Sequence, residues 1–287
     1  MVGRPTARRG AEERMSLVAI SDLHIRHKDN RAFTEKLWPE SADDWLLVAG
    51  DVAETTDDIL WAMGLLAERF PTVVWVPGNH DLWTVPSDPV RLRGKARYDH
   101  LVAALRGLGV HTPEDPYPVW EGPGGPVTVV PLFLLYDHTF RPEGAATKEE
   151  ALEIAYSRGV VCTDEHLLHP DPLPTRDAWC RARLDYTRAR LDSLAPGTDT
   201  VLVNHFPLVR EPTRILRYPE FAQWCGTEET ADWHTRYRAR AVVYGHLHIP
   251  RTITVDGVPH IEVSLGYPRE WGRRPHPPEG PRTVLPG

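Results

Sequence analysis

The chain has 287 residues, of which 41% are hydrophobic and 25% charged, and its formal net charge at pH 7 is −7. This composition predicts an ordinary globular protein and excludes a chain that is disordered throughout. The acidic balance disfavours a general nucleic-acid binder, because non-specific affinity for polyanions comes mostly from lysine and arginine patches.

Short apolar runs bounded by turn residues predict buried strands, and segments with helical spacing separate the first three of them. In chain order, the predicted strands cover residues 17–20, 45–49, 73–76, 127–135, 200–203, 241–244 and 258–264. The predicted helices cover residues 30–38, 56–70, 90–108, 148–158 and 175–194, with an N-terminal cap at residues 55–58. The β-α-β-α-β opening indicates an α/β fold with a mostly parallel sheet.

The other segments predict a single domain with additions. Residues 15–267 form the expected domain, and residues 137–198 could form a cap inserted beside its active site. The proline- and glycine-rich stretch before residue 127 predicts turns or a surface hairpin. Residues 1–14 are expected to be a flexible extension, and residues 268–287 a proline-rich tail without regular structure.

Polar side chains follow five of the predicted strands. The segments SDLH, AGD, GNHD, NHFP and YGHLH occur in this order, each at the end of a strand. Because the carboxyl ends of parallel strands meet at one edge of a sheet, these segments are expected to lie together and bind a ligand. Gly50, Gly78 and Gly245 within them are read as turn formers that let the backbone approach the site.

The five segments resemble the D-x-H, G-D, G-N-H-[DE], H and G-H-x-H pattern of the calcineurin-like metallophosphoesterase superfamily. The match extends from about residue 17 to residue 266, and no ligand position is replaced. The resemblance implies a four-layer sandwich in which two β-sheets pack face to face and are flanked by helices. It also implies a hydrolase with a binuclear metal centre.

By position in the family pattern, Asp51 bridges two metal ions. The resemblance assigns Asp22, His24 and His248 to the first ion, and Asn79, His205 and His246 to the second. Imidazole and oxygen ligands without a thiolate suit divalent or trivalent Mn, Fe, Zn, Co or Ni, and the identity of the metals stays open.

The resemblance further implies hydrolysis at phosphorus by a hydroxide that bridges the two ions. His80, next to Asn79, resembles the general acid of the family. Asp81 is expected either to orient and charge the His80 imidazole or to cap the helix that follows. Tyr136 and His138, after a predicted strand, are candidate substrate-binding residues, although an ordinary strand end accounts for them equally well. Arg176, on a predicted helix, could clamp an anionic group, but a solvated, ion-paired helix face is the favoured interpretation.

Several functions fit this chemistry. We expect a phosphatase for a small-molecule phosphomonoester, such as a nucleotide, a sugar phosphate or a phosphorylated biosynthetic intermediate. The alternative is a phosphodiesterase for cyclic nucleotides or other diesters. A nuclease is disfavoured because no basic tract is present, and a non-catalytic binding scaffold is disfavoured because every ligand is retained. The substrate and the oligomeric state stay open.

The cysteines and the hydropathy bear on the compartment. Cys162, Cys180 and Cys225 are widely spaced and form no CxxC, so they predict neither a disulfide framework nor a thiolate metal site. No segment reaches the ~18 apolar residues of a membrane span, and the N-terminus lacks the apolar core of a signal peptide. We therefore expect a cytoplasmic enzyme without a membrane partner.

Overall fold

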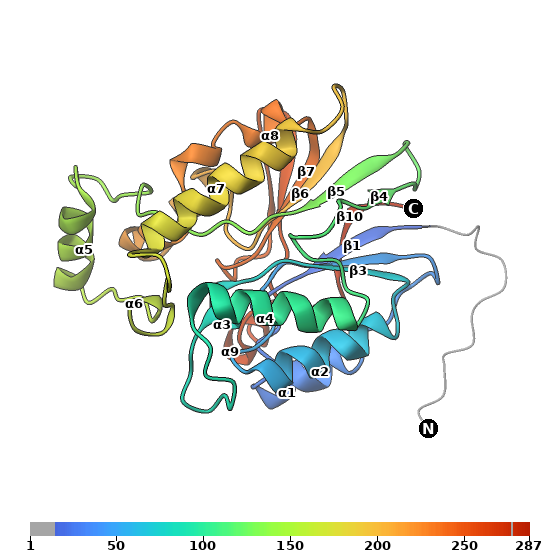
Figure 1. The fold of residues 1–287 in the computed structure, drawn as a ribbon, viewed down its shortest axis with the longest axis horizontal. Helices are drawn as coiled ribbons and strands as arrows, with labels where there is room; N and C mark the ends of the chain where they lie inside the picture. Colours follow the sequence, from blue (N-terminus) through green and yellow to red (C-terminus); the bar gives the residue numbers. More distant parts are fainter. Residues whose placement is uncertain (1–14, 277) are drawn as a thin grey trace.

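Two β-sheets pack face to face with helices on both outer sides (Figure 1). The structure, a computed structural model, describes residues 15–276 and 278–287, so the predicted extension at residues 1–14 lies outside the described residues. The expected four-layer arrangement is confirmed. No helix in the described part of the chain is long and apolar enough to cross a membrane.

The first sheet has the strand order β10-β1-β2-β3. Strands β1 (Leu17–Ile20), β2 (Trp45–Val48) and β3 (Thr72–Trp75) are parallel, and β10 (Arg282–Leu285) joins β1 in the antiparallel direction. Helices α1 (Lys28–Thr34), α2 (Thr56–Ala67) and α4 (Gly94–Gly107) cover its outer face (Figure 1). As predicted, Thr55 caps α2, since its side chain accepts a hydrogen bond from the backbone N–H of Asp58.

The second sheet has the order β4-β5-β6-β7-β9-β8. Strands β5 (Val127–Pro131), β6 (Thr200–Val203), β7 (Ala239–Tyr244) and β9 (Val258–Glu262) are parallel. The short strands β4 (Val119–Trp120) and β8 (Thr252–Val255) form antiparallel edges, and β4 makes the hairpin predicted before residue 127. Helices α7 (Arg176–Asp192) and α8 (Trp233–Arg236) lie on the outer side (Figure 1).

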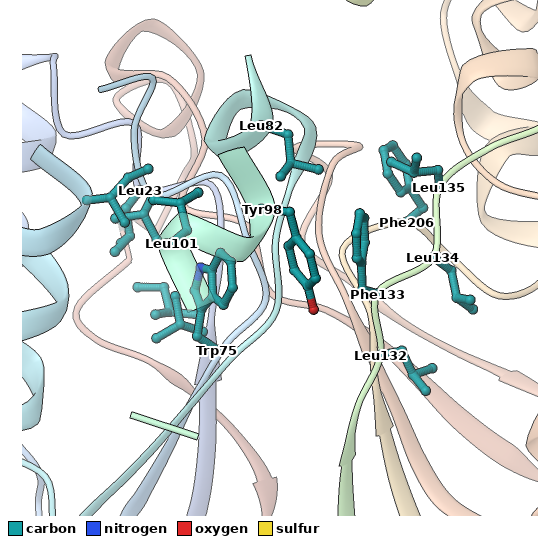
Figure 2. Close-up of a cluster of buried hydrophobic side chains, with 14 of the residues drawn as sticks. Leu23, Trp75, Leu82, Tyr98, Leu101, Leu132, Phe133, Leu134, Leu135 and Phe206 are labelled. Atoms are coloured by element: carbon teal, nitrogen blue, oxygen red, sulfur yellow. The ribbon is translucent and has the colours of Figure 1, made fainter. Parts of the chain in front are cut away.

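Alternate residues of the parallel strands fill the layer between the sheets. Leu17 and Ala19 of β1 belong to one buried cluster with Val127 and Val129 of β5, because successive side chains of a strand point to opposite faces. The other faces of the strands pack beneath the helices. Figure 2 shows Tyr98 of α4 beside Phe133, with ring centroids 4.3 Å apart, and Trp75 beside Leu101. Apolar packing therefore fixes the strands both between the sheets and beneath the helices.

Two expectations about the additions change. The tail predicted without regular structure contains α9 (Pro268–Trp271) and β10. Strand β10 forms because it pairs with β1 and buries Val284 and Leu285 between the sheets. The segment 137–198 contains α5 (Lys148–Ser157), α6 (Asp164–Leu167) and α7. Helix α7 is part of the sandwich itself, and only α5 and α6 extend beyond the sheet edge (Figure 1).

A buried arginine ties α4 to two of the loops at the carboxyl edge of the first sheet. Arg97 is fully buried, and its guanidinium donates to the backbone carbonyls of Asp81, at 2.7 Å, and Glu54, at 3.0 Å. It also donates to the carboxylate of Asp88 at 2.8 Å. These three bonds connect one helix to the loops after β2 and β3.

Arg97→Met is expected to lower the free energy of unfolding by about 3–5 kcal/mol, because it leaves the buried Asp88 carboxylate without its cation. Urea denaturation measures the change. Arg106→Met on the same helix is the matched control, since Arg106 forms an exposed pair with Asp115 and should change stability by less than about 1 kcal/mol. Equal losses in the two variants would contradict the role assigned to Arg97.

Candidate metal centre

Loops at the carboxyl ends of five parallel strands bring the candidate ligands to one edge of the sandwich. An isolated parallel bridge between Ser21 and Ser264 joins the two sheets at this edge. Asparagine and histidine after β3 form the start of the short helix α3 (Asn79–Leu82). The loops after β1, β2, β6 and β7 supply the remaining candidates, which are Asp22, His24, Asp51, His205, His246 and His248.

The backbone at the centre is held in an uncommon conformation. Five of the seven candidate ligands have positive φ angles, with values between 40° and 69° for Asp22, His24, Asp51, His246 and His248. Such angles in residues other than glycine are each unfavourable by about 1–3 kcal/mol and concentrate at functional sites. A β-carbon at Gly78 or Gly245 would clash with the carboxylates of Asp51 and Asp22, so the close packing requires glycine there.

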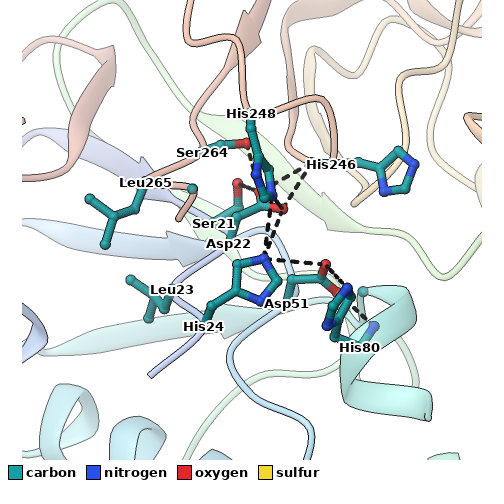
Figure 3. A network of polar contacts seen from close by, with 12 residues as sticks. Ser21, Asp22, Leu23, His24, Asp51, His80, His246, His248, Ser264 and Leu265 are labelled. Atoms are coloured by element: carbon teal, nitrogen blue, oxygen red, sulfur yellow. Dashed lines mark hydrogen bonds and ion pairs between the residues drawn. The ribbon is translucent and has the colours of Figure 1, made fainter. Parts of the chain in front are cut away.

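The first group of ligand atoms comprises Asp22, His24 and His248. The Nε2 atom of His248 lies 3.0 Å from Oδ1 of Asp22, and the Nε2 atom of His24 lies 3.9 Å from the same oxygen. The two Nε2 atoms are 3.3 Å apart. Two imidazole nitrogens and a carboxylate oxygen therefore face one small volume (Figure 3).

The second group contains Asp51, Asn79 and His205. The Nε2 atom of His205 lies 3.4 Å from Oδ2 of Asp51 and 3.0 Å from Oδ1 of Asn79. The same Asp51 oxygen is 3.9 Å from Nε2 of His24 in the first group. Asp51 is thus placed between the two groups, where a bridging carboxylate would have to lie.

His246 lies beside these groups with its ring turned away. Its backbone N–H donates to the carboxylate of Asp22, and Figure 3 shows its imidazole directed away from that carboxylate. The ring centroids of His246 and His205 are 5.2 Å apart. Among the described residues, the buried Nε2 atom of His246 has no hydrogen-bond partner. An imidazole nitrogen that could bind a metal ion is therefore left free beside the second group.

Outer contacts direct the histidine nitrogens toward the centre. Nδ1 of His205 contacts the carbonyl oxygen of Ala49 at 2.9 Å, and Nδ1 of His248 contacts the carboxylate of Glu270 at 2.7 Å. When Nδ1 donates in these contacts, the Nε2 lone pair faces the ligand cluster. Glu270 belongs to α9, in the segment predicted as a tail, so its role has no local sequence signal.

The ionisation of the site suits cations. Burial lowers the pKa of both His24 and His246 to about 3, so these imidazoles are neutral and can act as ligands. Burial alone raises the pKa values of Asp22 and Asp51, but the neighbouring histidines hold them below the usual range. Burial lowers the pKa values of His205 and His248 as well, but the carboxylates of Asp51 and Asp22 outweigh this effect and raise them to about 9 and about 10, so these two imidazoles would release a proton on binding a metal ion. Anionic oxygens and imidazoles thus converge without a thiolate. The residues present fit a pair of metal ions.

His80 is adjacent to the ligands but has its own carboxylate partner. Its Nδ1 atom lies 3.2 Å from Glu54, and its Nε2 atom lies 3.9 Å from Oδ2 of Asp51. The indole of Trp83 stacks on the imidazole with a centroid separation of 3.6 Å. Burial lowers the pKa of His80, but the carboxylates of Asp51 and Glu54 outweigh that effect and the net shift is upward.

Asp81 does not contact the His80 imidazole, and its bond to the N-cap residue Gly78 is a capping contact at the start of α3. Its carboxylate accepts hydrogen bonds from the backbone N–H groups of Asp51, Val52, Ala53 and Gly78. It therefore fixes two site loops, while the carboxylate that contacts the His80 imidazole is Glu54. Glu54 follows Asp51 by three residues in the same loop, and this proximity was the available sequence signal.

The three candidate substrate-binding residues lie behind the site. Tyr136 and His138 are completely buried, with Tyr136 bonded to Asp164 and His138 to Asp177. Arg176 pairs with Glu165 and donates to two backbone carbonyls. None of the three side chains lines the cleft that opens over the candidate ligands, so their contact with substrate stays a prediction.

A cleft of about 260 Å³ opens over the candidate metal ligands. One wall comes from residues 161–163, between α5 and α6, together with Phe221 of the 3-10 helix η2 (Pro219–Trp224). Tyr267 and Glu270 form the opposite wall. His80 and Trp83 also line the cleft, so the candidate general acid is accessible from it.

Comparisons with known proteins agree with this geometry. The family model described as calcineurin-like phosphoesterase matches residues 15–250. The chain is 60% identical over 277 residues to the [acyl-carrier-protein] phosphodiesterase PptH of Mycobacterium tuberculosis, covering 96% of this chain and 85% of that protein. The crystal structure of phosphopantetheinyl hydrolase (PptH) from M. tuberculosis superposes with a TM-score of 0.94 at 59% identity, covering 96% of this chain and 97% of that chain.

Proposed function

Because this chain belongs to the calcineurin-like phosphoesterase family and is a metal-dependent phosphoesterase, we propose that it cleaves the phosphodiester of a phosphopantetheinylated acyl carrier protein. The observation that carries this proposal is the 60% identity to the [acyl-carrier-protein] phosphodiesterase PptH across 96% of the chain. This substrate is a diester, so the proposal favours the phosphodiesterase alternative over a small-molecule phosphomonoester.

The proposed ligands divide into two sets that share Asp51. Asp22, His24 and His248 would hold one ion, and Asn79, His205 and His246 the other. Bound metal ions would neutralise charge on the phosphate oxygens and lower the pKa of water. The centre supplies imidazole and oxygen ligands, which suit Mn, Fe, Zn, Co or Ni.

His80 supplies the proton for the leaving oxygen in this proposal. Glu54 holds Nδ1 of the imidazole, which leaves Nε2 on the side of the candidate ligands, 3.9 Å from Oδ2 of Asp51. The neighbouring carboxylates favour the protonated ring, as the upward shift of its pKa indicates. An alkoxide leaving group on a carrier protein is a strong base, so its departure depends on this proton.

A direct assay tests the function. The protein reconstituted with Mn²⁺ is incubated with a phosphopantetheinylated acyl carrier protein, and mass spectrometry follows the loss of the phosphopantetheinyl group. Chromogenic mono- and diesters are compared in parallel. The expected result is release of the group and a preference for the diester. Hydrolysis of the chromogenic esters with an unchanged carrier protein would refute the proposed substrate but leave the phosphoesterase assignment intact.

Exposed apolar side chains near the cleft favour a protein-borne ester. Val161, which lines the cleft, is 67% exposed, and Tyr218, which precedes η2, is 53% exposed. Ile215, at the end of the 3-10 helix η1 (Glu211–Ile215), is 46% exposed, and η1 packs against η2. A carrier protein is joined to the scissile phosphate by a single ester oxygen. Its surface would therefore have to approach these residues during hydrolysis.

Ile215→Asp is expected to raise KM for the carrier protein about tenfold, through the loss of roughly 1.5 kcal/mol of apolar contact. Hydrolysis of bis(p-nitrophenyl) phosphate should stay unchanged. Val119→Asp is the matched control, because Val119 is also 46% exposed. It pairs with the start of β5, at the amino-terminal ends of the parallel strands, whereas the cleft lies at their carboxyl ends. Equal effects of the two substitutions would contradict an approach of the carrier protein over η1.

A further inference from the structure

Asp164 is a buried carboxylate that contacts the metal centre from outside the loops that carry the ligands. It is the first residue of α6, and its side chain is fully buried. Its Oδ1 atom accepts a hydrogen bond from Nδ2 of Asn79 at 2.9 Å and from Nε1 of Trp83 at 2.6 Å. Its Oδ2 atom accepts from the hydroxyl of Tyr136 at 3.0 Å. All three partners are donors, as an ionised carboxylate requires.

The bond to Asn79 decides which end of the amide faces the ligand cluster. The oxygen and nitrogen ends of a carboxamide have nearly the same shape, but only the oxygen has lone pairs for a metal ion. Because Asp164 can only accept, it holds the Nδ2 end of Asn79. The Oδ1 end then points to the second group of ligand atoms, 3.0 Å from Nε2 of His205.

The bond to Trp83 extends the same anchor to His80. The indole ring of Trp83 stacks on the imidazole of His80 with an interplanar angle of 28°. Fixing the indole Nε1 atom fixes the surface on which that imidazole rests. One carboxylate oxygen therefore restrains a proposed metal ligand and the support of the proposed general acid.

The position of Asp164 is itself held by the segment around α6. The guanidinium of Arg176, on α7, donates to the backbone carbonyl of Asp164 at 3.0 Å. The neighbouring Glu165 pairs with Arg176 and accepts from the indole of Trp224 at 2.9 Å. The backbone N–H of Thr84 bonds to the carbonyl of Leu167 at 3.0 Å. These contacts attach α6 both to α7 and to the chain that follows α3.

We propose that Asp164 is a positioning residue that fixes Asn79 as an oxygen ligand of the second metal ion and, through Trp83, fixes the plane of the His80 ring. This inference rests on the proposed ligand role of Asn79, and it needs no assumption about the substrate. Helix α6 is thus a supporting part of the proposed metal centre, directly after the residues 161–163 that form one wall of the cleft.

Metal titration tests the proposal. The metal-free protein is titrated with Mn²⁺, and calorimetry resolves the affinities of the two ions. Asp164→Ala is expected to weaken the binding of one ion by about 10- to 100-fold, which is the usual effect of removing a partner of a metal ligand. The affinity of the other ion should be retained. Retention of both affinities in the alanine variant would overturn the proposal.

Two further variants separate orientation from packing. Asp164→Asn keeps an oxygen for Asn79 and Trp83, while its new N–H group can donate to the Tyr136 hydroxyl, so it should restore binding to within about threefold of the unmodified protein. Tyr136→Phe removes a bond from the same carboxylate without affecting Asn79, so it should also bind both ions. A loss in Tyr136→Phe as large as that in Asp164→Ala would overturn the orienting role.

A third variant keeps the test informative if the alanine variant does not fold. Tyr136→Phe/Asp164→Ala also removes the hydroxyl that the single substitution would leave buried without a partner, which reduces the loss of stability. It should show the same selective weakening of one ion. Normal binding of both ions in this folded double variant would refute the proposal. Since no substrate is present, the result is independent of the carrier-protein assay.

Discussion

Asp51→Asn is expected to leave the protein folded but to prevent it from holding two metal ions, with a loss of hydrolysis of at least ~10³-fold. Oδ2 of Asp51 lies within 4 Å of the Nε2 atoms of His24, His80 and His205. An asparagine offers one neutral oxygen in place of two that share a negative charge. Loss of the transition-state charge stabilisation supplied by metal ions, worth several kcal/mol, corresponds to such a rate change.

Elemental analysis and hydrolysis of bis(p-nitrophenyl) phosphate measure this result together. Asp44→Asn is the matched control, because Asp44 is also a buried carboxylate but accepts from the backbone N–H groups of Ser16 and Ser41, away from the ligand cluster. The control is expected to retain both ions and its rate. If Asp51→Asn held two ions with normal turnover, Asp51 would not be the bridging ligand.

His80→Ala is expected to lower kcat for the carrier-protein diester by about 10²- to 10⁴-fold, the usual contribution of a general acid. The effect on bis(p-nitrophenyl) phosphate should be much smaller, since p-nitrophenolate leaves without a proton. Metal content should be unchanged, because Asp51 and His205 keep their contact at 3.4 Å without His80. Steady-state kinetics on both substrates, together with elemental analysis, check this outcome.

Two variants refine the assignment of the acid. His100→Ala on α4 removes a histidine that does not line the cleft, so both substrates should be hydrolysed normally. Glu54→Gln removes the negative charge of the side chain that contacts His80. It should lower kcat less than His80→Ala does, and again only for the substrate with the poor leaving group. Equal losses on the two substrates in His80→Ala would indicate a role in metal binding instead, since His80 also lies within reach of the His24 and Asp51 ligand atoms.

For the substrate, the small-molecule phosphomonoester expected from the sequence is less well supported than the alternative, a phosphodiester. The motifs specify chemistry at phosphorus, and this chemistry is shared by monoesters and diesters. The similarity to a protein named as an [acyl-carrier-protein] phosphodiesterase favours the diester. The proposed carrier-protein substrate also accords with the exposed side chain of Val161 in the cleft wall. The native metals and the cytoplasmic location stay predictions.

The sequence alone predicted the parallel strands, the longer helices and the order of the candidate ligands. Its apolar periodicity predicted the parallel strands, because residues buried on both faces of a sheet leave a continuous local signal. The short edge strands β4 and β8 and the strand β10 were not predicted as strands. They are brief or lie in proline-rich sequence, and β10 is stabilised by pairing with β1, which is remote in the chain.

The tertiary structure decided which polar groups support the ligands. Asp81 was the partner expected for His80 from the sequence, but loop geometry directs Asp81 to four backbone amides and Glu54 to the imidazole. Glu270 and Asp164 reach His248 and Asn79 from segments with no motif of their own. Local sequence motifs thus identify the candidate ligands. Their orientation depends on contacts between distant segments, which only the folded chain brings together.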